Sequence, residues 1–233
     1  MPINNSIARI ISRRKSNMFK YIFSILIIFT LLSCASVPEE TAVDRNKHVQ
    51  KTDSVKDIFE EPEIIDKPEL PIFIMGKGNV NADKLALFLL QNNSAVNSTY
   101  IKALAEYYID EASFEGVNHD IAFVQMCLET GYLRYGGDVK PEQYNFAGLG
   151  AVGNGEPGLS FPDPRTGVRA HIQHLKAYGS EAPLNGDLAD PRFRYVRRGA
   201  ALTYEGLAGT WAADRQYAVK INSILSRLYD FAF

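Results

Sequence analysis

The sequence predicts a mainly helical domain with a small hairpin lobe, which is an α+β class dominated by helices. Apolar residues recur at intervals of three and four in several segments between residues 81 and 228, as in amphipathic helices. Residues 148–161 interrupt this pattern, because they are rich in glycine and contain Pro157, which is typical of a loop or short hairpin. The 233 residues suffice for one globular domain and an additional segment.

Each expected helix has its own signals. Asn81 or Asp83 is expected to begin the first, which carries an apolar run at residues 85–89 and ends at residues 91–93. The second covers residues 98–116 and has a clear three-four periodicity. Two later helices are expected around residues 168–175 and 218–228, where apolar residues again recur at helical spacing.

A third helix, expected at residues 121–130, carries the strongest chemical signal. Its apolar residues point in nearly every direction, so this helix should be central and buried. Glu129 lies in its last turn, where apolar neighbours and the negative end of the helix dipole both disfavour a charged carboxylate. The pKa of Glu129 should therefore be raised, as a general acid in glycoside hydrolysis requires. A solvated glutamate at a fraying helix end is the alternative.

Residues 1–33 are predicted to be an export signal. Five basic residues and no acids accompany an apolar run at residues 21–32 that is short for a membrane span. The run ends in Leu-Leu-Ser-Cys, which resembles a bacterial lipobox, so Cys34 is expected to be lipidated. An uncleaved membrane anchor is the alternative, and Met18 is an alternative start. We therefore expect an exported protein, lipid-anchored to a bacterial membrane at the periplasmic face or the cell surface.

The next segment, residues 34–70, is predicted to be a disordered acidic tether, followed by a folded domain at residues 71–233. Ten acids and five bases lie between residues 35 and 70, with almost no aromatic side chain. Such a segment buries too little apolar surface to offset the entropy lost on ordering. Its expected role is to connect the lipid flexibly to the folded domain.

Composition narrows the function further. The net charge of −2 gives no basic field of the kind that binds nucleic acid. If Cys34 is lipidated, Cys127 has no disulfide partner, and its apolar neighbours predict a buried, inert thiol. His171 and His174 lie three residues apart, but no third ligand pattern accompanies them, so we expect no metal site.

Three ordered segments carry a family resemblance: residues 123–131 (FVQMCLETG), 137–150 (GDVKPEQYNFAGLG) and 211–221 (WAADRQYAVKI). The first ends in Glu-Thr-Gly, the second contains an Asn-Phe-x-Gly element, and the third contains a tyrosine. Together they make residues 72–230 resemble the peptidoglycan N-acetylglucosaminidases of glycoside hydrolase family 73. The resemblance implies a lysozyme-like helical domain in which a small hairpin lobe forms one wall of a groove.

The same resemblance implies roles for individual residues. Glu129 would be the catalytic acid, and Tyr217 would line the cleft, where it orients the substrate's acetamido group or hydrogen-bonds Glu129. Glu156, on the expected hairpin, is the first candidate for a second catalytic group, and Asp138 and Asp163 are weaker choices. The substrate's own acetamido oxygen is the alternative to a second carboxylate.

Four further residues are candidates for substrate binding, since flat aromatic faces suit sugar rings and amides bind hydroxyls: Tyr132, Tyr144, Asn145 and Phe146. Packing is the alternative for the aromatic residues, and holding a loop is the alternative for Asn145.

The expected function is hydrolysis of β-1,4 bonds in peptidoglycan glycan strands by an endo-β-N-acetylglucosaminidase, in cell-wall remodelling. We expect a monomer that needs no metal or cofactor. Two alternatives stay open. A lytic transglycosylase would use the same glutamate but leave a 1,6-anhydro product, and a non-catalytic peptidoglycan-binding lipoprotein would show no turnover.

Overall fold

A computed structural model describes residues 67–153 and 155–233 of the chain. The predicted signal at residues 1–33, the lipidation of Cys34 and most of the tether at residues 34–70 lie outside the described residues. Within the described part, no helix is both long enough and apolar enough to cross a bilayer.

Helices dominate the described residues, which confirms the predicted mainly helical class. The long helices are α2 (Ala82–Asn92), α3 (Ser98–Glu115), α4 (His119–Glu129), α5 (Pro164–Gly179) and α6 (Tyr217–Ala232). The short 3-10 helices are η1 (Pro141–Gln143), η2 (Phe193–Tyr195) and η3 (Tyr204–Leu207). Each predicted helix is present, with ends close to those that the sequence indicated.

Side-chain caps set the starts of these helices. Asn81, Asn97 and Asn118 each accept a hydrogen bond from a backbone N–H two or three residues further on. Asp163 does the same for α5, whose first residue is a proline. The caps therefore confirm Asn81, one of the two alternatives predicted for the start of α2.

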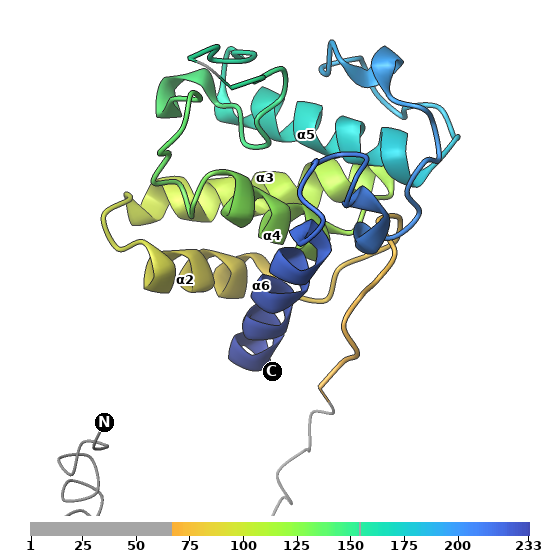
Figure 1. The fold of residues 1–233 in the computed structure, drawn as a ribbon. Coiled ribbons are helices and arrows are strands. Elements are labelled where there is room, and N and C mark those ends of the chain that lie inside the picture. The colour runs from red at the N-terminus through yellow and green to blue at the C-terminus, as the bar shows by residue number, and fades with distance from the viewer. Residues whose placement is uncertain (1–66, 154) are drawn as a thin grey trace, which may run out of the picture. The chain divides into compact units, whose positions relative to one another are not determined.

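The helices pack around α4. In Figure 1, α3 and α4 lie in the middle, α5 lies above them and α2 below, and α6 crosses in front at lower right. Nine of the eleven residues of α4 are buried, from His119 to Cys127. Cys127 is a fully buried free thiol, as predicted. This central helix carries its last residue, Glu129, out to the surface where the loops meet.

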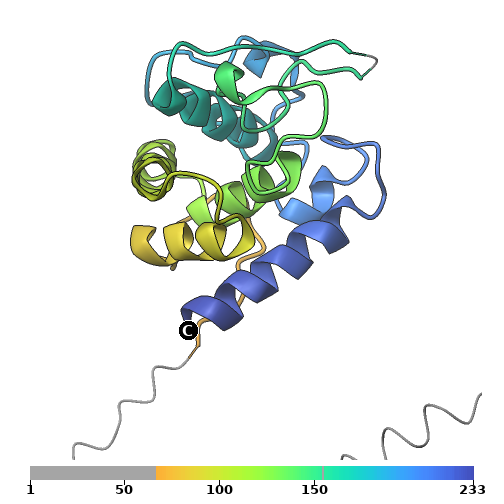
Figure 2. The ribbon, with the colours of Figure 1, turned by 90° about the vertical axis from the view of Figure 1, so that its left-hand side faces the viewer.

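The segment between α4 and α5 forms a lobe of loops. Where a hairpin was expected, the described residues of 148–161 hold one isolated antiparallel bridge, between Gly153 and Glu156, and no strand. Figure 2 shows this lobe, in green and teal, on the same side of the helical core as the blue loops before α6. The lobe approaches α5 closely at Gly167. A Cβ atom at this position would lie 1.9 Å from the carbonyl oxygen of Tyr144, so only glycine fits there.

Candidate active site

Two donors converge on the carboxylate of Glu129. Its Oε1 atom accepts a hydrogen bond from the indole Nε1 of Trp211 at 3.0 Å and another from the hydroxyl of Tyr217 at 2.5 Å. Trp211 lies in the loop after η3, and Tyr217 is the first residue of α6. The structure therefore brings together Glu129 and Tyr217, as the sequence predicted, and adds Trp211.

The environment of Glu129 raises the pKa of its carboxyl group. The side chain of Glu129 is exposed to the cleft, but the surrounding residues displace much of the water near its carboxylate. This desolvation is the main cause of the raised pKa. The hydrogen bonds from Tyr217 and Trp211 lower the pKa and offset part of that effect. The net direction confirms the expectation from the sequence. A carboxyl group that keeps its proton near neutral pH can act as a general acid.

A pocket of about 340 Å³ opens directly in front of this carboxylate. Besides Glu129, its lining consists of residues 135–139, Ala147, Gly148 and Ala151 from the lobe, and of Trp211, Ala212 and Tyr217 from the C-terminal part of the chain. These are the two sets of loops that lie on one side of the core in Figure 2. The pocket contains a second carboxylate, that of Asp138.

The three candidates for the second carboxylate occupy different places. Asp138 lines the Glu129 pocket and accepts a hydrogen bond from the backbone N–H of Gly155 at 3.2 Å. Glu156 is exposed and does not line this pocket. Asp163 caps α5 through the backbone N–H of Thr166, and these hydrogen bonds lower its pKa. The geometry thus favours Asp138, which the sequence had ranked below Glu156.

A neighbouring pocket of about 400 Å³ is lined by three tyrosines and by mostly apolar residues. Tyr100, Tyr135 and Tyr144 form much of its surface, together with Val96, Leu133, Pro141 and Glu142. Tyr135 lines both pockets, so the two are adjacent. Tyr144, a predicted substrate-binding residue, therefore lies beside the Glu129 pocket and not in it.

The other predicted binding residues lie elsewhere. Tyr132 lines neither pocket, and its hydroxyl accepts a hydrogen bond from Arg227 at 3.1 Å. Asn145 and Phe146 are each 1% exposed, behind the wall of the cleft. The amide of Asn145 binds the backbone of Leu149 and Leu159, which is the loop-holding alternative of the sequence analysis.

Unusual backbone conformations cluster around these pockets. The non-glycine residues with positive φ in the described chain are Tyr132 (59°), Leu133 (61°), Tyr135 (48°) and Tyr144 (49°). Bulky residues in this region of φ and ψ are strained, and such strain often marks functional sites. The turn after α4 therefore holds Tyr135 against the pocket at a conformational cost.

Two residues of the Glu129 pocket were not leading candidates from the sequence: Trp211 had no predicted role, and Asp138 was a weaker choice for the second carboxylate. Trp211 stands at the start of the third motif and is the one tryptophan of the chain, which was a usable signal. Asp138 gave a weaker signal, because its approach to Glu129 depends on the path of the loop. Among the described residues, no group of three or more His, Cys, Asp or Glu could hold a metal ion.

This chain is similar to a known protein family, to a bacterial relative and to a solved structure. Residues 105–230 match the glucosaminidase family, described as mannosyl-glycoprotein endo-beta-N-acetylglucosaminidase. An uncharacterized protein of Borreliella burgdorferi is 40% identical over 181 residues, which are 78% of this chain and 89% of that protein. A similar solved structure is the catalytic domain of the autolysin Auto from Listeria monocytogenes. It is 19% identical with a TM-score of 0.38, and the match covers 59% of this chain and 92% of that one.

Proposed function

The chain belongs to the glucosaminidase family, and we propose that it hydrolyses β-1,4 bonds of peptidoglycan glycan strands as an endo-β-N-acetylglucosaminidase. One observation carries the proposal: Glu129, with its raised pKa, faces an open pocket while two donors hold its Oε1 atom. A protonated carboxyl group in this position can deliver its proton to the oxygen of a glycosidic bond.

The reaction needs a group that stabilises positive charge on the sugar as the bond breaks. Asp138, across the same pocket, supports this role better than Glu156, because Glu156 does not line the pocket. The acetamido oxygen of an N-acetylglucosamine unit is the alternative. Tyr217 and Trp211 hold the acid in place, and the tyrosine-lined pocket beside it suits the next sugar ring of the strand.

Digestion of purified peptidoglycan tests this proposal. The purified protein and its Glu129→Gln variant are incubated with peptidoglycan, and the products are reduced and weighed by mass spectrometry. New reducing-end N-acetylglucosamine from the unaltered protein alone is the expected result. Anhydro ends would indicate a lytic transglycosylase, and wall binding without products from either protein would indicate a non-catalytic binding protein.

We further propose that the protein is exported and lipid-anchored through Cys34. The order of basic residues, apolar run and Ser-Cys pair supports this, and the acidic residues 34–70 would let the domain reach the wall. Expression in a bacterial host with radiolabelled palmitate tests it: the chain should incorporate label, and Cys34→Ala should abolish both label and membrane retention. Equal labelling of both proteins would contradict the proposal.

A further inference from the structure

Gln125 is a polar side chain inside the most buried helix of the domain. It is 0% exposed and lies one helical turn before Glu129, on the same face of α4. Its Nε2 atom donates a hydrogen bond to the hydroxyl oxygen of Tyr217 at 2.8 Å. Gln125 therefore touches the donor of the catalytic acid without touching the pocket.

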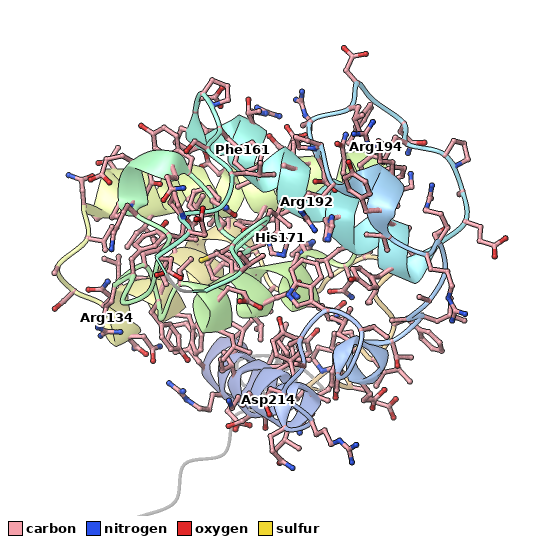
Figure 3. All side chains as sticks on the ribbon, turned by 45° about the horizontal axis from the view of Figure 1, so that its top comes forward. Arg134, Phe161, His171, Arg192, Arg194 and Asp214 are labelled. Atoms are coloured by element: carbon pink, nitrogen blue, oxygen red, sulfur yellow. The ribbon has the colours of Figure 1, made fainter. Side chains whose placement is uncertain are left out.

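Behind Gln125 lies His171 of α5, which is also fully buried. Its Nε2 atom is 2.9 Å from Oε1 of Gln125, and its Nδ1 atom is 2.9 Å from the hydroxyl of Tyr108. Figure 3 labels His171 on α5, in the interior between this helix and α4. Four hydrogen bonds thus connect Tyr108, His171, Gln125, Tyr217 and Glu129 in a row.

The chemistry of the groups fixes the direction of every bond in this row. An ionised Glu129 can only accept, so Tyr217 must donate to it, and the Tyr217 oxygen then takes the N–H of Gln125. The carbonyl oxygen of Gln125 can likewise only accept, so Nε2 of His171 carries the hydrogen. Burial and the nearby His174 lower the pKa of His171 to about 3. His171 is therefore neutral, and its bare Nδ1 accepts from Tyr108.

This ordered row determines which oxygen of Glu129 can hold a transferable proton. Oε1 already accepts from Tyr217 and Trp211, which occupies both of its lone pairs. Oε2 has no hydrogen-bond partner among the described residues, and it lies 3.9 Å from where a Cβ atom on Gly148 would be. Gly148 lines the pocket, so Oε2 is the oxygen that faces a bound substrate.

We propose that Gln125 and His171 are positioning residues that fix the Tyr217 hydroxyl as a donor to Oε1 and so place the acidic proton of Glu129 on Oε2. The inference rests on the proposed function for its role in turnover. The other titratable groups that face Glu129 are Tyr217 from α6 and, across the pocket, Asp138 and Tyr135. His171 is faced by His174 of its own helix and by Tyr108 of α3.

The first test is Gln125→Met, which keeps the length of the side chain and removes both hydrogen-bonding groups. We expect kcat to fall about tenfold with little change in KM, because a slightly misplaced catalytic group costs rate more than binding. The alkaline limb of the kcat profile should move to higher pH, because Glu129 then has a weaker donor at Oε1. In a Tyr217→Phe background, the same substitution should cause no further loss.

Gln173→Met is the matched control. Gln173 is equally buried, but its amide binds the backbone of Asp187 and Ala189, and it does not line the Glu129 pocket. This variant should lose thermal stability without moving the alkaline limb. If Gln125→Met alone does not fold, combining it with His171→Phe and Tyr108→Phe removes the imidazole and the buried hydroxyl that would otherwise lack partners, so that folding is retained while the row is still lost.

A readout that does not need turnover separates this inference from the proposed function. Carbon-13 NMR of labelled glutamate carboxyl groups, with the Glu129 signal assigned through Glu129→Gln, reports the pKa of Glu129 directly. We expect this pKa to rise in Gln125→Met and in Tyr217→Phe, even if the protein degrades no peptidoglycan. A folded Gln125→Met variant with the unaltered pKa would overturn the inference. So would a loss of kcat that is equally large in the Tyr217→Phe background.

Discussion

The indole nitrogen of Trp211 lies 3.0 Å from Oε1 of Glu129, although 82 residues separate them in the sequence. The indole ring also packs against His174, with the ring centroids 5.0 Å apart, and against Tyr178 at 5.6 Å. His174 is in turn hydrogen-bonded to the buried Asp190 at 2.6 Å. Helix α5 therefore supports both groups that donate to Glu129, Trp211 by packing and Tyr217 through His171 and Gln125.

Replacing Trp211 by phenylalanine should make Glu129 a weaker proton donor while keeping the aromatic packing. Loss of the indole donor raises the pKa of Glu129 further, because that hydrogen bond lowers it. A less acidic Glu129 is a poorer proton donor, so kcat should fall about tenfold, as expected for one hydrogen bond to a charged group. Activity requires the protonated acid, and its loss with rising pH should therefore occur at higher pH. A pH profile of kcat checks this, and an unshifted alkaline limb would contradict it.

A side chain at Gly148 should strain the backbone and narrow the space beside the catalytic candidate Glu129. The φ of Gly148 is +64°, and a Cβ atom would lie in ordinary contact with Oε2 of Glu129, at 3.9 Å, where it leaves less room for a glycosidic oxygen. Gly148→Ala should lower the free energy of unfolding by about 1–2 kcal/mol and reduce kcat/KM by more than about tenfold.

Gly116→Ala provides the matched control for that substitution. Gly116 has a φ of +75° at the end of α3, and the nearest atom to an added Cβ is the flexible Met75 side chain at 3.7 Å. It should lose similar stability in urea unfolding but retain its kcat/KM. Equal losses of activity in the two variants would show that strain alone, and not the space beside Oε2, accounts for the effect at Gly148.

Local sequence patterns predicted the helices and the direction of the Glu129 pKa shift well, because the signals are local. Apolar periodicity located each long helix, and the lone acid at the end of an apolar helix singled out Glu129, whose pKa is raised as expected. Gln125 was equally visible as a polar residue in that helix, four positions before Glu129, where i and i+4 side chains share a face. Its role could not be predicted from α4 alone, because its partners Tyr217 and His171 lie on other helices.

Loop geometry, in contrast, could not be predicted from local patterns. The choice between Asp138 and Glu156 depends on how residues 136–161 fold back on α5, and that path is set by long-range contacts such as Asn145 with Leu159. The same applies to Tyr132 and Tyr144, which do not line the Glu129 pocket although Tyr135, with a similar positive φ, does. The turn after α4 and the contacts of the lobe with α5 form only when the chain folds, so local sequence patterns do not indicate them.

The second carboxylate can be identified by a pair of isosteric substitutions. Asp138→Asn keeps an acceptor for the N–H of Gly155 but removes the charge that would stabilise an oxocarbenium-like centre. We expect kcat to fall at least about tenfold, whereas Glu156→Gln should retain activity because Glu156 is exposed outside the pocket. The rate at which each variant releases products from peptidoglycan measures the two activities.

Other outcomes of this pair are equally informative. Inactivation by Glu156→Gln alone would mean that the lobe moves over the pocket during turnover, and it would reject Asp138. Full activity in both variants would assign the nucleophile to the substrate's acetamido group.

The stability of the domain at low pH should depend on Glu111. Its carboxylate is 3% exposed and accepts hydrogen bonds from Arg165 at 2.6 Å and from Arg169 at 2.8 Å. Burial alone would raise the pKa of Glu111, but the hydrogen bonds from Arg169 and Arg165 outweigh it, so the pKa is lowered. A group with a lowered pKa stabilises the fold above its ordinary pKa, and this stabilisation is lost as the pH falls through the folded-state value.

Glu111→Gln should therefore cost about 2 kcal/mol of unfolding free energy at neutral pH, the typical contribution of hydrogen bonds to a charged group. The difference from the unaltered protein should begin to shrink below the ordinary pKa of a glutamate, where the unfolded chain takes up a proton, and should be lost once the pH falls below the lowered pKa of Glu111 in the folded state. Urea unfolding across this pH range measures the difference. A difference that stayed constant down to acid pH would mean that Glu111 contributes through its shape and packing, and not through its charge.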